Sequence, residues 1–234
     1  IKEDYSEIQV KNYKTIEIDN GDVIDILNTK NSVYGYLSSN GGFEIDEVWG
    51  SYSTTTRAFV GPNGGKKLAD NQKIFLKKSE EFSSRLLIYS DTKIEFIRVI
   101  EGTNYKYFSE ESIKNFFSKE YFVTNLSDRM GMRLDGQKLK NLKNTNIKSE
   151  GLVKGTIQVP ADGNPIILLS DHGTIGGYPK LAVVISADYD RLVQIPPGSK
   201  IRFEKVKLKD AENLYKLYIM ETNNILNKIL WTLK

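Results

Sequence analysis

The apolar residues of this chain come in short runs that turn residues interrupt. The longest purely apolar runs, such as Ile166–Leu169 and Leu181–Ile185, are only four or five residues long. Runs of this length are typical of β-strands, whereas a membrane-spanning helix needs about 20 consecutive apolar residues. The pattern therefore predicts a fold of many short strands, with no membrane-spanning segment among these residues.

Turn residues divide the chain into a regular series of predicted strands. The spacing favours a β-sandwich or barrel over parallel β-α-β units, because short strands follow one another with little helix between them. A hairpin is predicted around Ser90–Thr92. The predicted strands are Glu7–Val10, Thr15–Ile18, Val23–Ile26, Val33–Leu37, Arg85–Tyr89, Ile94–Val99, Thr156–Val159, Ile166–Leu169, Lys180–Ile185 and Lys200–Glu204.

Two helices are predicted among the strands. Ser109 is a suitable N-cap for the first, with Glu110 and Glu111 in its first turn. Asp210 is the predicted N-cap of a long amphipathic helix whose apolar stripe runs from Ala211 to Leu233. The sequence predicts that this stripe packs on the protein's own sheet.

Three polar stretches are predicted to lack regular structure. Ser127–Gly136 is interpreted as irregular, and the Asn- and Lys-rich Asn141–Glu150 as a solvated loop. Pro196–Ser199 predicts a tight turn, since proline fixes φ near −65° and glycine accepts positive φ.

Composition excludes several kinds of site. The chain has no cysteine, so disulfides, thiolate catalysis and cysteine metal sites are excluded, and one histidine, so two-histidine metal sites are excluded too. No metal site is therefore predicted within this chain. A net charge of +3 is too small to indicate nucleic-acid binding. The first ten residues contain no signal-peptide core, and the composition is compatible with the cytoplasm.

The stretch Gly61–Lys67, GPNGGKK, resembles a phosphate-binding loop only superficially. Three residues, not four, separate its first glycine from the Gly-Lys pair, and Lys67 stands where a magnesium-binding hydroxyl is needed. A glycine-rich turn is the favoured interpretation.

The segment Asp171–Pro179, DHGTIGGYP, carries the strongest sign of a site. Three glycines between two apolar strands indicate a sharp turn or a close approach to a ligand, and exposed amides there could hold an anion. His172 next to Asp171 could move protons near neutral pH, although a lone histidine is more often only a hydrogen-bonding residue. A plain glycine-rich connection is the competing interpretation.

Two arginines lie four residues apart upstream of this segment. Arg129 and Arg133 could together bind a carboxylate through bidentate hydrogen bonds. Pairing with Asp128 or Asp135 for a structural purpose is equally compatible with the spacing.

These segments and others resemble the KipA family, which is also called allophanate hydrolase subunit 2 and is associated with the C subunit of 5-oxoprolinase. The resemblance follows the family order over most of residues 38–203. It rests on SSNGGFEIDEVWGSYST (Ser38–Thr54), SDRMGMRLDG (Ser127–Gly136), SEGLVKGTIQVPADGNPIILLSDHGTIGGYPKLAVVIS (Ser149–Ser186) and LVQIPPGSKIRF (Leu192–Phe203).

The resemblance implies a mainly β fold of cyclophilin-like barrel lobes with a few helices, including a long C-terminal one. It implies an N-terminal β lobe over residues 1–100, without the family's usual N-terminal segment, and a C-terminal lobe over residues 101–234. The family's loop usually reads D-x-Q-T-T-G-G-Y-P, so Gly173 and Ile175 replace two polar residues here.

The resemblance further implies a bacterial, cytoplasmic component of an ATP-dependent 5-oxoprolinase. This is a hetero-oligomeric hydrolase that opens 5-oxoproline to glutamate, and the implied partners are its A and KipI-like B subunits. ATP would act on the assembled complex. On this interpretation Asp171 is the general acid/base, with Gln158 and Tyr178 orienting. The expected substrate-binding residues are Arg129, Arg133, Thr174, Gly176, Gly177, His172, Lys180 and Ser51.

Two alternatives stay open. One is a non-catalytic regulatory protein that acts by docking on a KipI-like partner, which the substitutions at residues 173 and 175 favour. The other is a component of a biotin-dependent carboxyltransferase, as in urea amidolyase. Biotin would then arrive on another chain, because the Met-Lys-Met acceptor motif is absent from this sequence.

Overall fold

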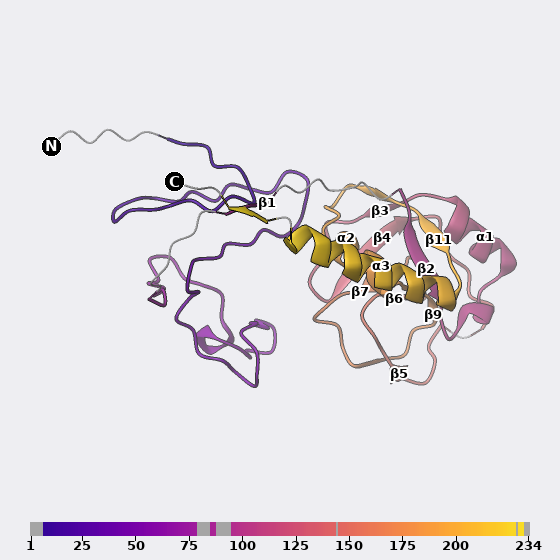
Figure 1. Cartoon of the computed structure of the whole chain (residues 1–234). Helices are drawn as coiled ribbons and strands as arrows, with labels where there is room; N and C mark the ends of the chain where they lie inside the picture. Colours follow the sequence, from indigo (N-terminus) through magenta and orange to yellow (C-terminus); the bar gives the residue numbers. More distant parts are fainter. Residues whose placement is uncertain (1–6, 79–84, 88–94, 144, 228, 232–234) are drawn as a thin grey trace. The chain divides into compact units, whose positions relative to one another are not determined.

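The computed structural model describes residues 7–78, 85–87, 95–143, 145–227 and 229–231 (Figure 1). The chain divides into two compact units. Unit 1 comprises residues 1–25, 35–89 and 228–234, and unit 2 comprises residues 26–34 and 90–227. The division into lobes over 1–100 and 101–234 stays a prediction.

Unit 2 is built around one eight-stranded sheet. Its strands follow the order β10-β3-β4-β7-β6-β9-β2-β11, and every pair is antiparallel except β2 with β11. The bounds are β2 (Ile97–Glu101), β3 (Tyr121–Val123), β4 (Gly131–Gly136), β6 (Thr156–Gln158), β7 (Ile166–Leu168), β9 (Lys180–Val184), β10 (Lys200–Ile201) and β11 (Phe203–Lys205).

The two ends of this sheet meet, so that it forms a nearly closed barrel. β10 and β11 stand at opposite ends of the strand order, yet only Arg202 separates them in the chain. The first half of the segment pairs with β3 and the second half with β2. Closure removes most of the open edge that a flat sheet would present. The predicted mainly β, barrel-type fold is confirmed.

The barrel encloses the core of unit 2. In β2 and β3 the buried side chains alternate, as the period of two in β-structure requires, whereas β6 and most of β9 are buried at every position. An aromatic group lies within the core, where the rings of Phe116 and Phe203 stack with centroids 4.4 Å apart. The largest fully buried side chains are Tyr121, Phe116, Phe203, Ile97, Leu134, Ile157, Ile167, Leu181 and Leu192.

Three α-helices accompany the barrel. In α1 (Glu110–Ser118) the predicted Ser109 cap is confirmed, since its hydroxyl accepts a hydrogen bond from the backbone nitrogen of Ser112 (3.1 Å). The short α2 (Ser186–Leu192) was not predicted from the sequence. It packs against the long α3 (Leu208–Asn227), golden in Figure 1.

An ion pair with one buried member attaches α2 to the barrel. Asp188, which is completely buried, accepts hydrogen bonds from the backbone nitrogen (2.8 Å), Nε (2.9 Å) and Nη2 (2.5 Å) of Arg98 on β2. The hydrogen bonds to Asp188 raise the pKa of Arg98. The carboxylate thus links α2 to β2, in addition to the buried side chains of Ala187, Tyr189 and Leu192.

Gln194, just beyond α2, attaches a distant segment to unit 2. Its Oε1 accepts hydrogen bonds from the backbone nitrogens of Val33 (3.1 Å) and Tyr34 (2.8 Å), and its Nε2 donates to the oxygen of Tyr34 (3.3 Å). One glutamine side chain thus forms three hydrogen bonds with the backbone of this segment.

Three local predictions for unit 2 are wrong. Residues Gly131–Gly136, interpreted as irregular, form strand β4, because Met132 and Leu134 point into the core. The long helix begins at Leu208, so Asp210 lies in its first turn instead of capping it. The helix also ends at Asn227, before the predicted Leu233.

The predicted hairpin around residues 90–92, which themselves lie outside the described residues, is also wrong. Its first strand, β1 (Arg85–Leu87), pairs with β12 (Ile229–Trp231), whereas β2 pairs with β9 and β11. β2 therefore has both of its edges occupied.

Unit 1 contains little regular structure among its described residues. Apart from β1 with β12, it has the short 3-10 turn η1 (Asn63–Gly65) and isolated bridges such as Phe43 with Leu76. The predicted glycine turn at Gly61–Lys67 is confirmed, since a Cβ on Gly65 would lie 2.0 Å from the carbonyl carbon of Phe59. The four strands predicted between residues 7 and 37 are not formed as strands.

Candidate functional site

The glycine-rich loop Asp171–Pro179 joins β7 to β9 and is attached to a neighbouring segment. Within it, β8 (Ile175–Gly176) pairs with β5 (Glu150–Gly151). Backbone hydrogen bonds flank this pair, from Ile147 to the oxygen of Gly177 (2.8 Å) and from Leu152 to the oxygen of Thr174 (2.9 Å). We call residues 147–152 the strap. The predicted solvated loop over Asn141–Glu150 holds for residues 147–149, which form no strand or helix and are mostly exposed, whereas Glu150 belongs to β5.

The strap explains two of the three glycines. A Cβ on Gly177 would lie 2.9 Å from the backbone oxygen of Ile147, and one on Gly176 would lie 2.8 Å from Leu152 Cδ1. Neither glycine has φ in the left-handed region. The glycines therefore allow a close approach of two backbone segments of the same chain. Anion binding by the amides of Gly176, Gly177 and Thr174 stays a prediction.

Two buried polar residues hold the loop and the strap onto the barrel. Gln158 and Lys180 are opposite one another across β6 and β9. Gln158 Nε2 donates to the backbone oxygen of Tyr178 in the loop (3.4 Å), and Lys180 Nζ lies 2.8 Å from Glu150 Oε2 in the strap. In the structure Gln158 and Lys180 therefore act as supports, and their predicted orienting and substrate-binding roles stay predictions.

Asn104, which the sequence interpretation missed, completes this support. It is buried, its Oδ1 accepts a hydrogen bond from the backbone nitrogen of Lys180 (3.1 Å), and its own backbone nitrogen donates to the oxygen of Lys180 (3.1 Å). No local pattern marks this asparagine, because its partner lies 76 residues away in the chain.

Arg129 and Asp171 form a bidentate ion pair at the start of the loop. Arg129 Nε donates to Asp171 Oδ2 (2.7 Å) and Nη2 to Oδ1 (3.0 Å), while the backbone nitrogen of Asp171 donates to the oxygen of Arg129 (3.0 Å). The Arg129 side chain is 54% exposed and that of Asp171 14%. This is an accessible guanidinium beside a largely buried carboxylate, 42 residues apart in sequence.

The second predicted arginine lies in a different setting. Arg133 is exposed in the middle of β4, between the inward-pointing Met132 and Leu134, whereas Arg129 lies in the turn before that strand. Strand geometry therefore directs Arg133 to the outer surface of the barrel. Bidentate binding of one ligand by both arginines stays a prediction.

His172 follows Asp171 and makes a specific hydrogen bond. Its Nδ1 lies 2.6 Å from the backbone oxygen of Gly173. Because a carbonyl oxygen only accepts, Nδ1 must carry the proton, which leaves the lone pair of the neutral ring on Nε2. The geometry thus assigns Nε2 as the basic atom of this side chain.

The remaining predicted residues are exposed. Thr174 and Tyr178 are exposed in the loop, and so is Ile175, with 67% of its surface accessible. Ser51 belongs to unit 1, where its hydroxyl accepts a hydrogen bond from the backbone nitrogen of Ser53 (3.1 Å). Its substrate-binding role stays a prediction.

Tyr189 on α2 lies next to the start of the loop. Its hydroxyl lies 3.2 Å from that of Ser170, the residue before Asp171, and Lys154 Nζ lies 4.8 Å from its ring centroid. Burial raises the pKa of Tyr189. The sequence interpretation missed this residue, because only the folded barrel brings α2 beside the loop.

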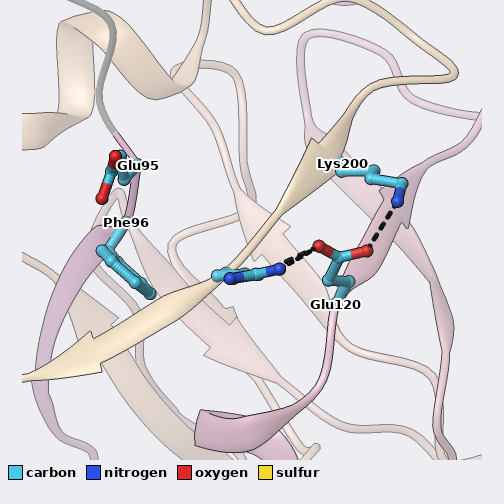
Figure 2. Close-up of a pocket in the computed structure, with 5 residues that line it drawn as sticks. Glu95, Phe96, Glu120 and Lys200 are labelled. Atoms are coloured by element: carbon cyan, nitrogen blue, oxygen red, sulfur yellow. Dashed lines mark hydrogen bonds and ion pairs between the residues drawn. The ribbon is translucent and has the colours of Figure 1, made fainter.

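A pocket of about 320 Å³ lies elsewhere, at the seam where the barrel closes (Figure 2). It is lined by Glu95, Phe96, Glu120, Lys200 and Arg202, none of which the sequence predicted as a site residue. Glu120 pairs with Lys200 (2.8 Å) and with Arg202. The hydrogen bonds from Lys200, then from Arg202, lower the pKa of Glu120. The carboxylate thus neutralises the two cationic side chains beside it.

The described residues provide neither a metal site nor a membrane-spanning helix. They contain no group of three His, Cys, Asp or Glu side chains arranged to hold a metal ion. None of the helices among them is long and apolar enough to cross a membrane.

Known proteins that are similar to this chain include C subunits of 5-oxoprolinase and urea amidolyases. The chain is 34% identical to the C subunit of 5-oxoprolinase from Haemophilus influenzae over 86% of its length and 33% identical to that from Escherichia coli over 82%. It spans 65% and 62% of these two proteins. The Kluyveromyces lactis urea amidolyase structure superposes with a TM-score of 0.70 and 26% identity, over 82% of this chain and 14% of that one.

The family profile described as "Carboxyltransferase domain, subdomain A and B" matches residues 2–205. The resemblance seen in the sequence is therefore confirmed. The chain belongs to the carboxyltransferase domain family that includes the C subunits of 5-oxoprolinase and the urea amidolyases.

Proposed function

We propose that the chain is part of a 5-oxoprolinase-type hydrolase that opens 5-oxoproline to glutamate together with the A and KipI-like B subunits. The observation that carries the proposal is the Arg129–Asp171 pair at the start of the glycine-rich loop. An exposed guanidinium that already binds one carboxylate can exchange it for the carboxylate of a substrate. The identity to two proteins named as C subunits of 5-oxoprolinase supports this choice of substrate.

The residues of the loop have the chemistry that lactam opening requires. Water adds to the lactam carbonyl carbon, the C–N bond breaks, and the proton lost by the water goes to the leaving nitrogen. When the substrate occupies Arg129, Asp171 is released and can receive and return that proton. The basic Nε2 of His172 is a second proton acceptor beside it. The amides of Gly176 and Gly177 are the proposed cradle for negative charge that develops on the carbonyl oxygen.

ATP is the implied co-substrate, but Gly61–Lys67 does not fit a triphosphate. The side-chain Nδ2 of Asn63 donates hydrogen bonds to the backbone oxygens of Lys66 (3.2 Å) and Lys67 (3.0 Å), so a side chain of the turn itself closes it. We therefore assign ATP binding to the assembled complex and derive no step from it.

The test is reconstitution. Purified chain, mixed with its A and B partners, ATP and 5-oxoproline, is expected to release glutamate. The homologous Haemophilus influenzae protein with its own partners serves as the active control. Absence of glutamate from the full set, while the control set is active, would reject the proposal.

One observation favours a regulatory alternative. Ile175 is 67% exposed in the position where the family has a polar residue, so the loop presents an apolar side chain that suits docking on a KipI-like partner. In that case Asp171→Ala would leave partner affinity unchanged and Ile175→Asp would lower it by about tenfold or more. A carboxyltransferase role, supported by the urea amidolyase relatives, would instead require decarboxylation of carboxybiotin by the chain.

A further inference from the structure

Tyr189 connects the start of the glycine-rich loop to a firmly attached part of α2. Its ring belongs to the core of unit 2, and only 5% of its surface is exposed. The residues on either side of it are also held in place, because Asp188 pairs with Arg98 on β2 and Asp190 accepts a hydrogen bond from Tyr218 on α3. The Tyr189 hydroxyl therefore belongs to a residue with little freedom to move.

The partner of this hydroxyl lies directly before the proposed proton-transfer group. Tyr189 Oη lies 3.2 Å from Ser170 Oγ, and either hydroxyl can donate the hydrogen bond. Burial raises the pKa of Tyr189, so its hydroxyl keeps its proton near neutral pH. Asp171 follows Ser170 in the chain, and its side chain is 14% exposed. A fixed hydroxyl thus holds the residue next to Asp171.

This anchor matters most when Asp171 loses its ion pair. In the structure the backbone nitrogen of Asp171 donates to the oxygen of Arg129 (3.0 Å), and the Arg129 guanidinium holds its carboxylate. In the proposed reaction the substrate carboxylate takes the guanidinium, so the Asp171 carboxylate is released. The backbone hydrogen bond and the Ser170 anchor then keep Asp171 beside the reacting atoms, where an error of about 1 Å can cost about 100-fold in rate.

We propose that Tyr189 is a positioning residue that holds Asp171 in place for proton transfer through the hydroxyl of Ser170. The role in proton transfer rests on the proposed function, whereas the mechanical link from Tyr189 to Asp171 does not. Because the anchor acts on Asp171 and leaves the guanidinium of Arg129 unchanged, it serves the chemical step and contributes little to substrate binding.

The first test measures the link in the full chain alone, by hydrogen exchange of the Asp171 amide relative to its intrinsic rate. Tyr189→Phe should accelerate this exchange by about two- to tenfold, the range expected for the loss of one hydrogen bond. Ser170→Ala should have the same effect, and combining the two should add little, because both remove one contact. Tyr218→Phe is the matched control, since it removes a tyrosine hydroxyl that bonds to Asp190 of the same helix, and it should leave this exchange within about 1.5-fold.

The second test uses the reconstituted enzyme. Tyr189→Phe should lower kcat by about three- to tenfold and leave KM for 5-oxoproline within about twofold. In an Asp171→Asn background the same substitution should cost no further kcat, because the group that it positions is already lost. A merely structural role would lower kcat equally in both backgrounds. Ser170→Thr, which keeps a hydroxyl, should retain most of the activity that Ser170→Ala loses.

The two tests fail separately. Unchanged exchange of the Asp171 amide in Tyr189→Phe would overturn the proposal whatever the enzyme does. Accelerated exchange with an unchanged kcat would overturn the positioning role in catalysis, as would an equal loss of kcat with and without the Asp171 carboxylate. An inactive wild-type set would reject the proposed function, and the exchange result would still decide whether Tyr189 holds Asp171.

Discussion

Lys180 Nζ lies 2.8 Å from Glu150 Oε2, and the two side chains differ sharply in exposure, at 6% and 46%. Glu150→Ala would leave a buried ammonium without this carboxylate, and we expect a loss of about 1–3 kcal/mol of unfolding free energy. Lys180→Met removes the buried charge and returns Glu150 to water, so we expect a change within about 1 kcal/mol. The free energy of unfolding is measured by the hydrogen exchange of the slowest amides of β9.

A control for this asymmetry lies on α3. Lys209 and Glu212 form an exposed pair at 3.6 Å, and Glu212→Ala should change stability by no more than about 0.5 kcal/mol. If Glu150→Ala and Lys180→Met lowered the unfolding free energy equally, the buried ammonium of Lys180 would not depend on the Glu150 carboxylate for its stability.

Gly177→Ala should detach the strap from the loop. The new Cβ would lie 2.9 Å from the backbone oxygen of Ile147, and backbone cannot yield as a side chain can. We expect exchange of the Ile147 amide, which donates to the oxygen of Gly177, to accelerate by about tenfold or more.

Substitutions at two neighbouring glycines serve as controls for Gly177→Ala. In Gly176→Ala the nearest atoms belong to the side chains of Leu152 and Gln158, so a smaller acceleration is expected, and Gly151→Ala meets nothing within 4 Å. An equal response to all three substitutions would mean that the close approach at Gly177 does not hold the strap.

Arg129 and Arg133 can be separated by kinetics in the reconstituted enzyme. Arg129→Lys removes bidentate binding, so we expect KM for 5-oxoproline to rise by about tenfold or more with less effect on kcat. Asp171→Asn should lower kcat by about 10²–10⁴, the usual range for a lost proton-transfer group. Arg133→Lys, on the outer face of β4, should stay within about twofold of wild type. A loss at Arg133 equal to that at Arg129 would reject our choice of arginine.

The sequence predicts well what depends on neighbouring residues. The Ser109 cap, the Pro196–Ser199 turn with Gly198 at φ +84°, and strands β6, β7 and β9 follow from spacing and turn chemistry. The pairing of Arg129 with Asp171, by contrast, depends on the register of β4 with β7, which local pattern does not encode. The same holds for Asn104 with Lys180.

The strands predicted in unit 1 show the opposite case. Alternation at Ile16 and Ile18 specifies a strand only if another strand lies beside it, since an isolated strand has no hydrogen-bonding partner. A local pattern can therefore be read correctly as a strand preference while the described residues of unit 1 leave it unpaired.

Asp188→Ala should destabilise unit 2. The substitution leaves three donor nitrogens of Arg98 without their acceptor, two of them in the guanidinium. Because the Arg98 side chain is 25% exposed and can be partly hydrated, we expect a cost of about 1–3 kcal/mol, the penalty for donors that lose their acceptor. Exchange of the β2 and α2 amides measures the loss. A double variant, Asp188→Leu with Arg98→Met, should recover part of the lost stability. If the double variant were as unstable as Asp188→Ala, the ion pair would not be what attaches α2.

Tyr218 and Asp190 predict a pH dependence at the junction of α3 and α2. The Tyr218 hydroxyl donates to Asp190 Oδ2 (2.5 Å), and this hydrogen bond, followed by burial, raises the pKa of Tyr218 to about 12. Since the unfolded-state pKa is about 10, the unfolded chain loses the tyrosine proton first. The stabilisation is therefore complete below about pH 10 and disappears as the pH rises through about 12.

We expect Tyr218→Phe to cost about 0.5–1 kcal/mol at pH 8, a small value because the pair is exposed to solvent screening. The difference between wild type and variant should shrink above about pH 10, as measured by urea unfolding followed by circular dichroism. Asp190→Asn should remove most of the same increment, and adding it to Tyr218→Phe should cost little more. A difference that stays constant up to pH 12 would mean that the hydroxyl of Tyr218 is not held by Asp190.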